Sequence, residues 1–347
     1  MMEIVNLDDC KLSLKNGFYG GAAGSKDGII YQGENWLVKY PKNIIGLDRT
    51  GEASYSTSPL SEYIGSHIYE ILGYDVHETM LGERHNKIVV ACKDFTKDAT
   101  LMEIRTIKNH TSEELDELLE QSIGGSTGSE HVVDLEELLL HLRNNSILKG
   151  VPGIEERFWE QAVIDIFINN NDRNNGNWGI LRTNDGTDRI APVFDNGGSF
   201  QTKISEEKIE KILTDLELAK KNASNTQTAY GIRGHILSAV RFLDLYENYE
   251  GLRQALIKVV PSIQLCMSKI QEFIMQIPEK HNGKDDKEYL ICSANRKELF
   301  MIQLKARLED LLLPYYDKAL KRNLQELDEC QNQSSVNHGI VRHKRGR

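Results

Sequence analysis

The chain has 347 residues, enough for about two domains or for one fold of two lobes. Hydrophobic types make up 39% of it and charged types 27%, which excludes collagen-like, disulfide-scaffold and wholly disordered chains. The 52 acidic residues outnumber the 42 basic ones and the net charge is −10, so direct binding of nucleic acid is not expected.

The sequence also indicates in which cellular compartment the protein is expected. No stretch of 18 apolar residues is present, so we expect no membrane span, and the acidic N-terminus does not resemble a secretory signal peptide. Five cysteines lie far apart without a CxxC pair, which supports neither a zinc site nor a disulfide framework. A reducing, cytoplasmic compartment is the default expectation.

The first 95 residues predict strands and turns around one helix. Residues 31–40 predict a hairpin, because a glycine-containing turn separates two β-rich arms. Ser58 and Pro59 open a helix with Ser58 as its N-cap, and an apolar stripe at helical spacing runs on to Gly73. Residues 87–95, KIVVACKDF, form a short apolar run typical of a buried strand.

Beyond residue 100 the pattern becomes helical. Helices are expected at residues 111–121, 134–143 and 154–168. After residue 205 we expect four or five more, broken near residues 223–230 and 281–287.

The chain ends in a basic segment. Residues 336–347 hold Arg342, Lys344, Arg345 and Arg347 and no acid, which predicts a flexible tail. Such a run serves either as a nuclear-localisation or polyanion-binding patch or simply as a solvated end. We therefore expect an α+β fold of three parts: a β-rich N-lobe at 1–95, a helical C-lobe at 96–335 and a tail at 336–347.

The most informative stretch is residues 169–198. Asp172 is followed five residues later by Asn177, and then by two β-rich arms around an Asp-Gly turn that predict a hairpin ending before Asp195. Antiparallel arms of similar length would place Asn177 and Asp195 side by side, about 5 Å apart. Carboxylate and amide oxygens at that spacing can share a hard cation such as Mg²⁺.

This arrangement matches the needs of phosphoryl transfer from ATP. One Asp accepts the proton of the acceptor hydroxyl, an Asn five residues on holds one metal ion, and a second Asp holds the metal that bridges the phosphates. The alternative is that residues 169–176 form an ordinary turn, because Asn, Asp and Gly favour turns. A turn alone, however, needs neither the hairpin nor the second acid.

The β-rich part supplies candidate nucleotide-binding groups. Residues 16–26 form a glycine-rich loop whose backbone N–H groups can approach phosphate oxygens, although a plain loop has the same composition. Lys39 lies on the second hairpin arm, where it either reaches the phosphates or faces solvent. Glu62 is the expected ion-pair partner of Lys39. Its position on the helix is compatible with a side chain that faces either the edge of a cleft or solvent.

Together these motifs resemble the HipA-like serine/threonine kinases, and among them the short pro-inflammatory bacterial type. The resemblance covers about residues 15–200 and is carried by the glycine loop, LVK, SEYIGSHIYEILG, KIVVACKDF, DRNNGNWG and APVFDNGG, in that order. It implies a two-lobed, protein-kinase-like fold with ATP bound between a small β-rich N-lobe and a large helical C-lobe.

The resemblance also implies roles for individual residues. Asp172 would be the catalytic base, Lys39 the phosphate-binding lysine and Glu62 its ion-pair partner, while Asn177 and Asp195 would bind Mg²⁺. The remaining nucleotide-binding positions would be Gly20, Gly21 and Gly24 in the phosphate loop, and Ala91 to Lys93 in the hinge that reads adenine.

Three departures from related patterns have consequences. Asn171 stands where eukaryotic kinases have the Arg that senses a phosphorylated activation loop, so control by that route is not expected. Asp195 is followed by Asn-Gly-Gly, without the usual Phe switch. The glycine loop begins near residue 16, leaving no room for the subdomain that precedes the kinase core in HipA toxins, which argues against the same pairing with a DNA-binding antitoxin.

We therefore expect an ATP- and Mg²⁺-dependent kinase that phosphorylates Ser or Thr on a cellular or host protein. Two alternatives are a small-molecule kinase that uses the same cleft, and an ATP-binding pseudokinase that acts as an interaction module. Autophosphorylation is expected, and Ser25, Ser199, Thr202 and Ser205 are its candidate sites. Phosphate on Ser25 would repel the phosphates of ATP, which singles this residue out. The alternative for each is an ordinary loop hydroxyl or a helix cap, as the Glu206-Glu207 pair after Ser205 suggests. The resemblance also favours action inside a host cell, with the nucleus as a further destination through the basic tail.

Overall fold

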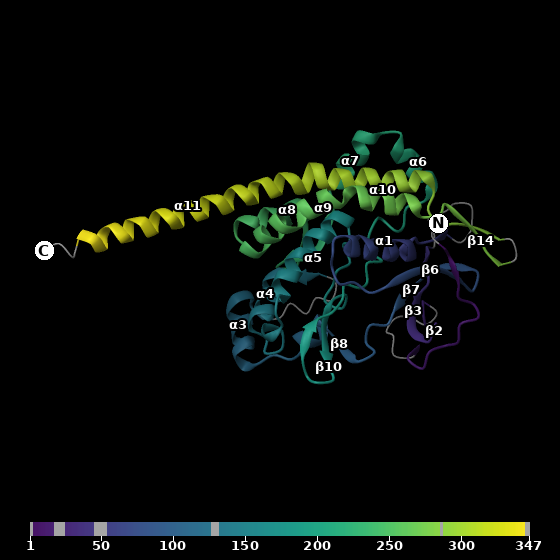
Figure 1. Cartoon of the computed structure of the whole chain (residues 1–347), viewed down its shortest axis with the longest axis horizontal. Coiled ribbons are helices and arrows are strands. Elements are labelled where there is room, and N and C mark those ends of the chain that lie inside the picture. The colour runs from purple at the N-terminus through teal and green to yellow at the C-terminus, as the bar shows by residue number, and fades with distance from the viewer. Residues whose placement is uncertain (1–2, 17–24, 45–53, 126–131, 285–286, 344–347) are drawn as a thin grey trace.

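The computed structural model describes residues 3–16, 25–44, 54–125, 132–284 and 287–343. Figure 1 shows a β-rich N-terminal part beside a larger, mainly helical part, so the predicted two-lobed α+β architecture is confirmed. Among these residues, none of the helices combines the length and apolar character that a membrane crossing requires.

The N-lobe is built on a five-stranded sheet. Its strands, in spatial order, are β1 (Val5–Asn6), β6 (Thr79–Arg84), β7 (Lys87–Lys93), β3 (Glu34–Lys39) and β2 (Lys26–Tyr31). The β2–β3 hairpin and the buried strand β7 confirm two of the predictions. A small apolar cluster forms on the sheet around Trp36, Val38 and Val89.

Helix α1 (Ser58–Ile71) joins the two lobes. It packs on β6 and β7, and Figure 1 shows it lying between the N-lobe sheet and the long helices of the C-lobe. Its apolar side chains, including Ile64 and Ile68, belong to the main core, which continues into the C-lobe. Thr57 rather than the expected Ser58 is the N-cap residue, so the helix begins one residue earlier than predicted.

The C-lobe centres on α5 (Ile154–Ile168), which is mostly buried, and on the long helix α9 (Glu250–Gln276), which packs its apolar face against α5. The helices expected at 111–121 and 134–143 are α3 (Glu113–Ile123) and α4 (Leu135–Asn144), with Ser112 and Asp134 as their N-caps. The remaining helices are α2 (Ile104–Lys108), α6 (Glu206–Leu213), α7 (Leu216–Ser224), α8 (Ala239–Asp244), α10 (Ala294–Ala306) and α11 (Leu313–His343).

The C-lobe also contains short strands that the sequence pattern does not predict. They are β8 (Ala99–Glu103), β9 (Val133–Asp134), β12 (Gln227–Ile232), β13 (His235–Ser238), β14 (Lys280–Asn282) and β15 (Glu288–Leu290). Both breaks expected in the helical region therefore lead into hairpins, β12–β13 and β14–β15. These strands are short and partly exposed, so they lack a sustained alternation of apolar and polar residues.

Helix α11 differs from the expected flexible tail, because it continues through residue 336 to His343. In Figure 1 its C-terminal half projects beyond the body of the protein. The last four residues, 344–347, lie outside the described part of the chain.

Candidate active site

A cavity of about 940 Å³ opens between the lobes. This volume is within the range of roughly 300–1,000 Å³ that is common for small-molecule sites. Its walls come from the N-lobe sheet, the chain that follows β7, strand β8 and the loops around the hairpin of β10 (Gly179–Thr183) and β11 (Asp188–Ile190). Among the residues that line it are Lys39, His77, Cys92, Asn177 and Asp195.

Lys39, Glu62 and Asp195 meet at the inner wall of this cavity. Lys39 Nζ lies 2.8 Å from Glu62 Oε2 and 2.9 Å from Asp195 Oδ1, so one ammonium group joins β3, α1 and the segment after β11. Burial alone would lower the pKa of Lys39, but Asp195 and Glu62 outweigh it and raise the pKa well above its usual value. The lysine therefore stays charged at any physiological pH.

Glu62 is held on both carboxylate oxygens. Besides the bond to Lys39, its Oε1 lies 3.0 Å from His77 Nε2 and accepts a hydrogen bond of 3.0 Å from the backbone N–H of Asn196. Burial would raise the pKa of Glu62, but Lys39 and His77 outweigh it and hold the pKa well below the usual range. The open question of where Glu62 points is thus answered: its side chain faces Lys39 and is only 1% exposed.

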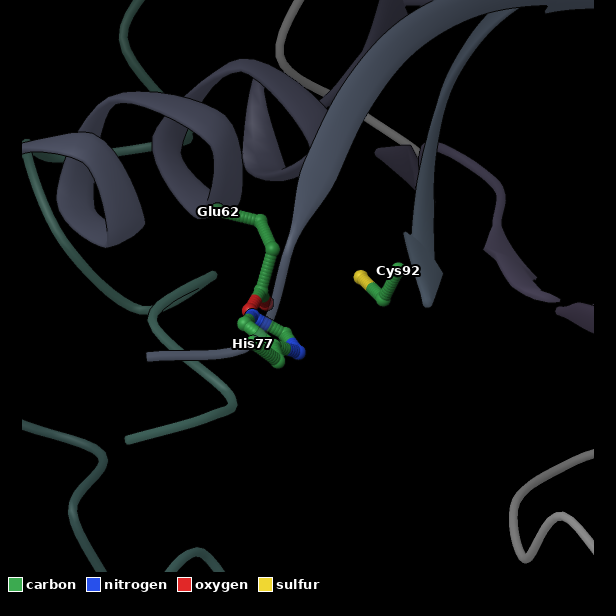
Figure 2. Close-up of side chains that lie close together, drawn as sticks. All are labelled: Glu62, His77 and Cys92. Carbon is green, nitrogen blue, oxygen red and sulfur yellow. The ribbon is translucent and has the colours of Figure 1, made fainter. Parts of the chain in front are cut away.

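Figure 2 shows the side chains of Glu62 and His77 meeting, with the sulfur of Cys92 directed toward them from β7. Their ligand atoms lie within 4.8 Å of one another, a spacing that a metal ion could bridge. The chemistry does not fit, because burial raises the pKa of the Cys92 thiol well above its usual value and both oxygens of Glu62 already accept hydrogen bonds. We therefore assign no metal to this trio.

The loop with Asp172 begins where α5 ends. Asn169 terminates that helix in the left-handed conformation (φ 56°), which Asn adopts more readily than most residues. Asp172 is exposed beyond this turn. Asn177 Nδ2 donates a hydrogen bond of 2.6 Å to the backbone carbonyl of Asp172, which fixes the two residues relative to each other. Asn177 Oδ1 accepts no hydrogen bond from the described residues.

The predicted hairpin is present as β10 (Gly179–Thr183) and β11 (Asp188–Ile190), but its register corrects the expected pairing. Ile180 lies opposite Ile190, and continuing this register places Val193, rather than Asp195, opposite Asn177. Val193 itself bridges to Val76 of the N-lobe, so the strand leaves the hairpin before Asp195. Asn177 and Asp195 nevertheless line the same cavity.

Arg173 connects the segments that carry these residues. Its Nη1 donates to the backbone carbonyls of Asn177 (2.9 Å) and Phe194 (2.5 Å). Its Nε and Nη2 form a bidentate pair with Asp165 of α5, at 2.8 and 3.1 Å. Nη2 also donates to the side chain of Asn196. This buried guanidinium therefore ties the Asp172 loop, the Asp195 segment and α5 together.

The donor set fits a hard divalent cation. Asn177 offers an amide oxygen and Asp195 a carboxylate that is 36% exposed toward the cavity, and oxygen ligands of this kind are those that Mg²⁺ prefers. Lys39 supplies the adjacent positive charge that phosphate oxygens require. Asn177, Asp195 and Lys39 are thus the residues able to hold a metal–nucleotide complex.

The other predicted nucleotide-binding positions have different outcomes. Gly20, Gly21 and Gly24 lie outside the described residues. Ala91 is fully buried within β7, opposite Val38, and does not line the cavity, so the expected hinge assignment is displaced toward the C-terminus. Lys93 does line the cavity, and the connection to β8 that follows it, beginning at Asp94, is the segment between the lobes.

Sequence reasoning missed several groups around the site. Lys15 binds Asp94 at 2.8 Å and holds the connection between the lobes, while His77 and Asn196 hold Glu62. Arg173 directly follows Asp172, and a basic residue in a polar loop gives no sign that it is buried. The isolated His77 carries no motif. Only its approach to Glu62 in space identifies its role.

Comparisons with known proteins agree with this geometry. No family model matches the chain. The serine/threonine-protein kinase CtkA of Helicobacter pylori is 29% identical over 335 residues, covering 95% of this chain and 93% of its own length. The crystal structure of a proinflammatory kinase CtkA of the same species matches with a TM-score of 0.75 at 28% identity, over 92% of this chain and 98% of that one.

A more distant match is the HipA protein of Shewanella oneidensis in a complex with HipB and operator DNA. It has a TM-score of 0.48 and 15% identity, covers 91% of this chain and 70% of that one, and is too weak to support a conclusion. The agreement with CtkA extends over almost the whole chain in both sequence and structure. The chain is therefore similar to the serine/threonine-protein kinase CtkA over almost its whole length, in agreement with the kinase resemblance that its motifs carry.

Proposed function

We propose that the protein transfers the terminal phosphoryl group of ATP to serine or threonine side chains of proteins, with Mg²⁺ as the metal. The observation that carries this proposal is the position of Lys39 Nζ, bonded to both Glu62 and Asp195 at the wall of a cavity that Asn177 also lines. A fixed cation beside two oxygen ligands is the arrangement that phosphoryl transfer requires.

Each residue has a distinct task in this proposal. Lys39, oriented by Glu62, binds the phosphates and stabilises charge on the transferring group. Asp172 orients the acceptor hydroxyl and takes its proton. Asn177 and Asp195 would hold Mg²⁺, which when bound neutralises charge on the phosphate oxygens. Arg173 keeps the two ligand-bearing segments at a constant separation, so positioning contributes to the rate.

The proposed target is a cellular or host protein with an accessible serine or threonine. The relative that matches over nearly the whole chain is named a serine/threonine-protein kinase, and this favours a polypeptide over a small-molecule acceptor. Autophosphorylation forms part of the proposal, and among the candidate sites Ser199 is excluded in the folded protein because its side chain is fully buried. Ser25, next to the N-lobe sheet, remains the first candidate.

The test is transfer of label from γ-phosphate-labelled ATP to the protein itself, to a generic protein substrate and to a cell lysate. Asp172→Asn should lower turnover by about 10²–10⁴-fold, the usual contribution of a general base. Asp195→Asn should be at least as damaging, because it removes the negative charge that would hold the metal and that pairs with Lys39. The matched control is Asp317→Asn, which neutralises an exposed carboxylate on α11 away from the cavity.

The location of the label distinguishes the outcomes. Label in polypeptide supports the proposal, whereas label only in a small metabolite would indicate a small-molecule kinase. Thermal stabilisation by ATP with no transfer would indicate a nucleotide-binding interaction module. Wild-type rates in both the Asp172 and the Asp195 variants would overturn the proposed roles of these two residues.

A further inference from the structure

A second cavity, of about 530 Å³, lies on the other side of the Asp172 loop. It is bounded by that loop, by the segment from Gly198 to Ile204, and by helices α6, α7 and α10. Among its lining residues are Asn171, Gly198, Gln201, Lys203, Lys208 and Gln303. The proposed kinase mechanism makes no use of these side chains.

Asp172 stands between the two cavities. Asn171, immediately before it, lines the second cavity, whereas Asn174 and Asn177, which follow it, line the nucleotide cavity. Gly198, which also lines the second cavity, packs directly against the catalytic loop: a Cβ atom added there would lie 2.8 Å from Asp172 Cβ. An acceptor hydroxyl must reach Asp172 from a side that ATP does not fill, and the second cavity lies on such a side.

The lining has a definite charge. Lys203 and Lys208 are its two ionisable residues, and both are exposed. Two acids of α6 next to Lys208 pair elsewhere, Glu206 with Arg296 and Glu207 with Lys211. The lining of this cavity, in a protein of net charge −10, therefore carries two lysines and no acid next to the candidate catalytic base.

The wall also holds an unused hydrogen-bonding atom. Gln303 of α10 is 4% exposed and lines the cavity; its Nε2 donates to Gln201 at 3.3 Å, while its Oε1 has no partner among the described residues. A buried polar atom without a partner costs free energy, and a ligand that supplies a donor removes this cost. A peptide backbone N–H is such a donor, and an acidic side chain beside it would meet the lysines.

We propose that this second cavity binds the acceptor polypeptide and that Lys203 and Lys208 select serine or threonine sites flanked by acidic residues. The inference rests on the proposed kinase function and adds the substrate class to it. Exposed ion pairs are individually weak, so each lysine should change kcat/KM about 2–5-fold and the pair about 10-fold. The selectivity should weaken at high ionic strength.

The experiment uses the full-length protein and a serine-centred degenerate peptide array in which one position at a time is fixed as Asp, Asn, Lys or phosphoserine. Wild type should favour Asp over Asn at one or more flanking positions. The double substitution Lys203→Gln/Lys208→Gln should abolish this preference, and Lys203→Glu/Lys208→Glu should turn it toward Lys. A preference for phosphoserine above Asp would identify phosphate as the preferred anion.

The control is Lys221→Gln on α7, an exposed lysine that does not line the cavity, and it should leave the preference unchanged. The inference is overturned if wild type shows no preference for acidic positions, if the preference survives in the double Gln variant, or if whole proteins are phosphorylated but no peptide is. In each of these cases Asp172-dependent transfer to protein would still be observed. Failure of the kinase function itself would instead appear as no transfer to any polypeptide.

Discussion

Arg173 is a buried cation whose contacts explain how the catalytic segments keep their relative positions. It pairs with Asp165 in two hydrogen bonds and reaches the backbone carbonyls of Asn177 and Phe194. Because the guanidinium is planar and rigid, these contacts fix directions as well as distances. A lysine would supply the charge without this geometry.

We expect Arg173→Met to lower the free energy of unfolding by about 3–5 kcal/mol, because it leaves the buried Asp165 without its cationic partner. Where the variant is still folded, kcat should fall by more than tenfold while the KM for ATP changes less, since Lys39 is untouched. Chemical denaturation and steady-state kinetics at low temperature measure both effects. Arg173→Lys should recover part of the stability and little of the kcat.

The control for this prediction is Arg182→Met, which breaks an exposed pair with Asp188 on the β10–β11 hairpin. Exposed pairs of this kind contribute about 0–1 kcal/mol. Equal losses of stability and turnover in the Arg173 and Arg182 variants would contradict the positioning role.

Asn196 explains how the protein functions without an aromatic residue after Asp195. Its backbone N–H binds Glu62, its Nδ2 donates to Ser66 Oγ at 3.0 Å, and its side-chain oxygen accepts from Arg173. Hydrogen bonds thus join the Asp195 segment to α1 where eukaryotic kinases use a packed Phe. This arrangement favours a permanently assembled Lys39–Glu62 pair.

At the scale of single elements, α4 carries a buried histidine that should make stability depend on pH. His141 lies 1% exposed in this helix, and burial, helped by Lys108, lowers its pKa to about 4. Its pKa in an unfolded chain is about 6.5. Above that pH the imidazole is neutral in both states, so no dependence is expected there.

Below pH 6.5 His141 binds a proton in the unfolded chain but not in the folded chain, so the free energy of unfolding falls as the pH drops toward 4. The His141 contribution should amount to about 2 kcal/mol at pH 5. His141→Gln should therefore lose less stability than wild type between pH 7.5 and pH 5, measured by urea unfolding. His110→Gln, at an exposed position, should follow wild type; equal pH profiles for all three proteins would contradict the prediction.

At the scale of the whole molecule, the β14–β15 hairpin forms a contact between the lobes. Figure 1 shows this hairpin beside β6 of the N-lobe sheet. His281 Nε2 lies 3.4 Å from Glu83 Oε2, and the backbone N–H of Lys284 donates to the same oxygen at 3.4 Å. Glu83 is buried, so this contact and the continuous core through α1 together limit how far the lobes can separate.

Gly283 brings the hairpin close to Glu83, because a Cβ atom there would lie 2.5–2.6 Å from both carboxylate oxygens. Gly283→Ala should displace the hairpin and lower the free energy of unfolding by about 1–3 kcal/mol, the usual cost of overpacking. Gly150→Ala, at a position with no atom within 4 Å, should change it by less than about 0.5 kcal/mol. The two variants are compared by thermal unfolding, and equal stability would show that this contact does not constrain the lobes.

Much of the local structure is predictable because its signals lie close together in the chain. The β2–β3 hairpin, the apolar run of β7, helix α5 and the turn with Asp172 and Asn177 each depend on interactions within a few residues. The end of α11 and the short strands β8 and β12–β15 are not predicted, because side-chain patterns of three to six residues do not distinguish such strands from loops.

The candidate site, too, is predictable from the sequence only in part. The residue types and spacing of Asp172, Asn177 and Asp195, together with the hairpin signal between them, predict metal-assisted phosphoryl transfer. The register of β10 and β11 shows in addition that Asn177 and Asp195 are not direct neighbours across the hairpin, although they line the same cavity. The placement of Ala91 within a strand likewise follows from its pairing with Val38.

The amino-acid sequence alone determined the class of chemistry, since the kinds of oxygen and nitrogen atoms available, and their order along the chain, are properties of the covalent structure. Only the tertiary structure decided which of these atoms meet. Lys39, Glu62 and Asp195 span 156 positions along the chain yet share one hydrogen-bonded centre. Contacts over such separations depend on how α1, the N-lobe sheet and α5 pack into a common core, and no local pattern encodes that packing.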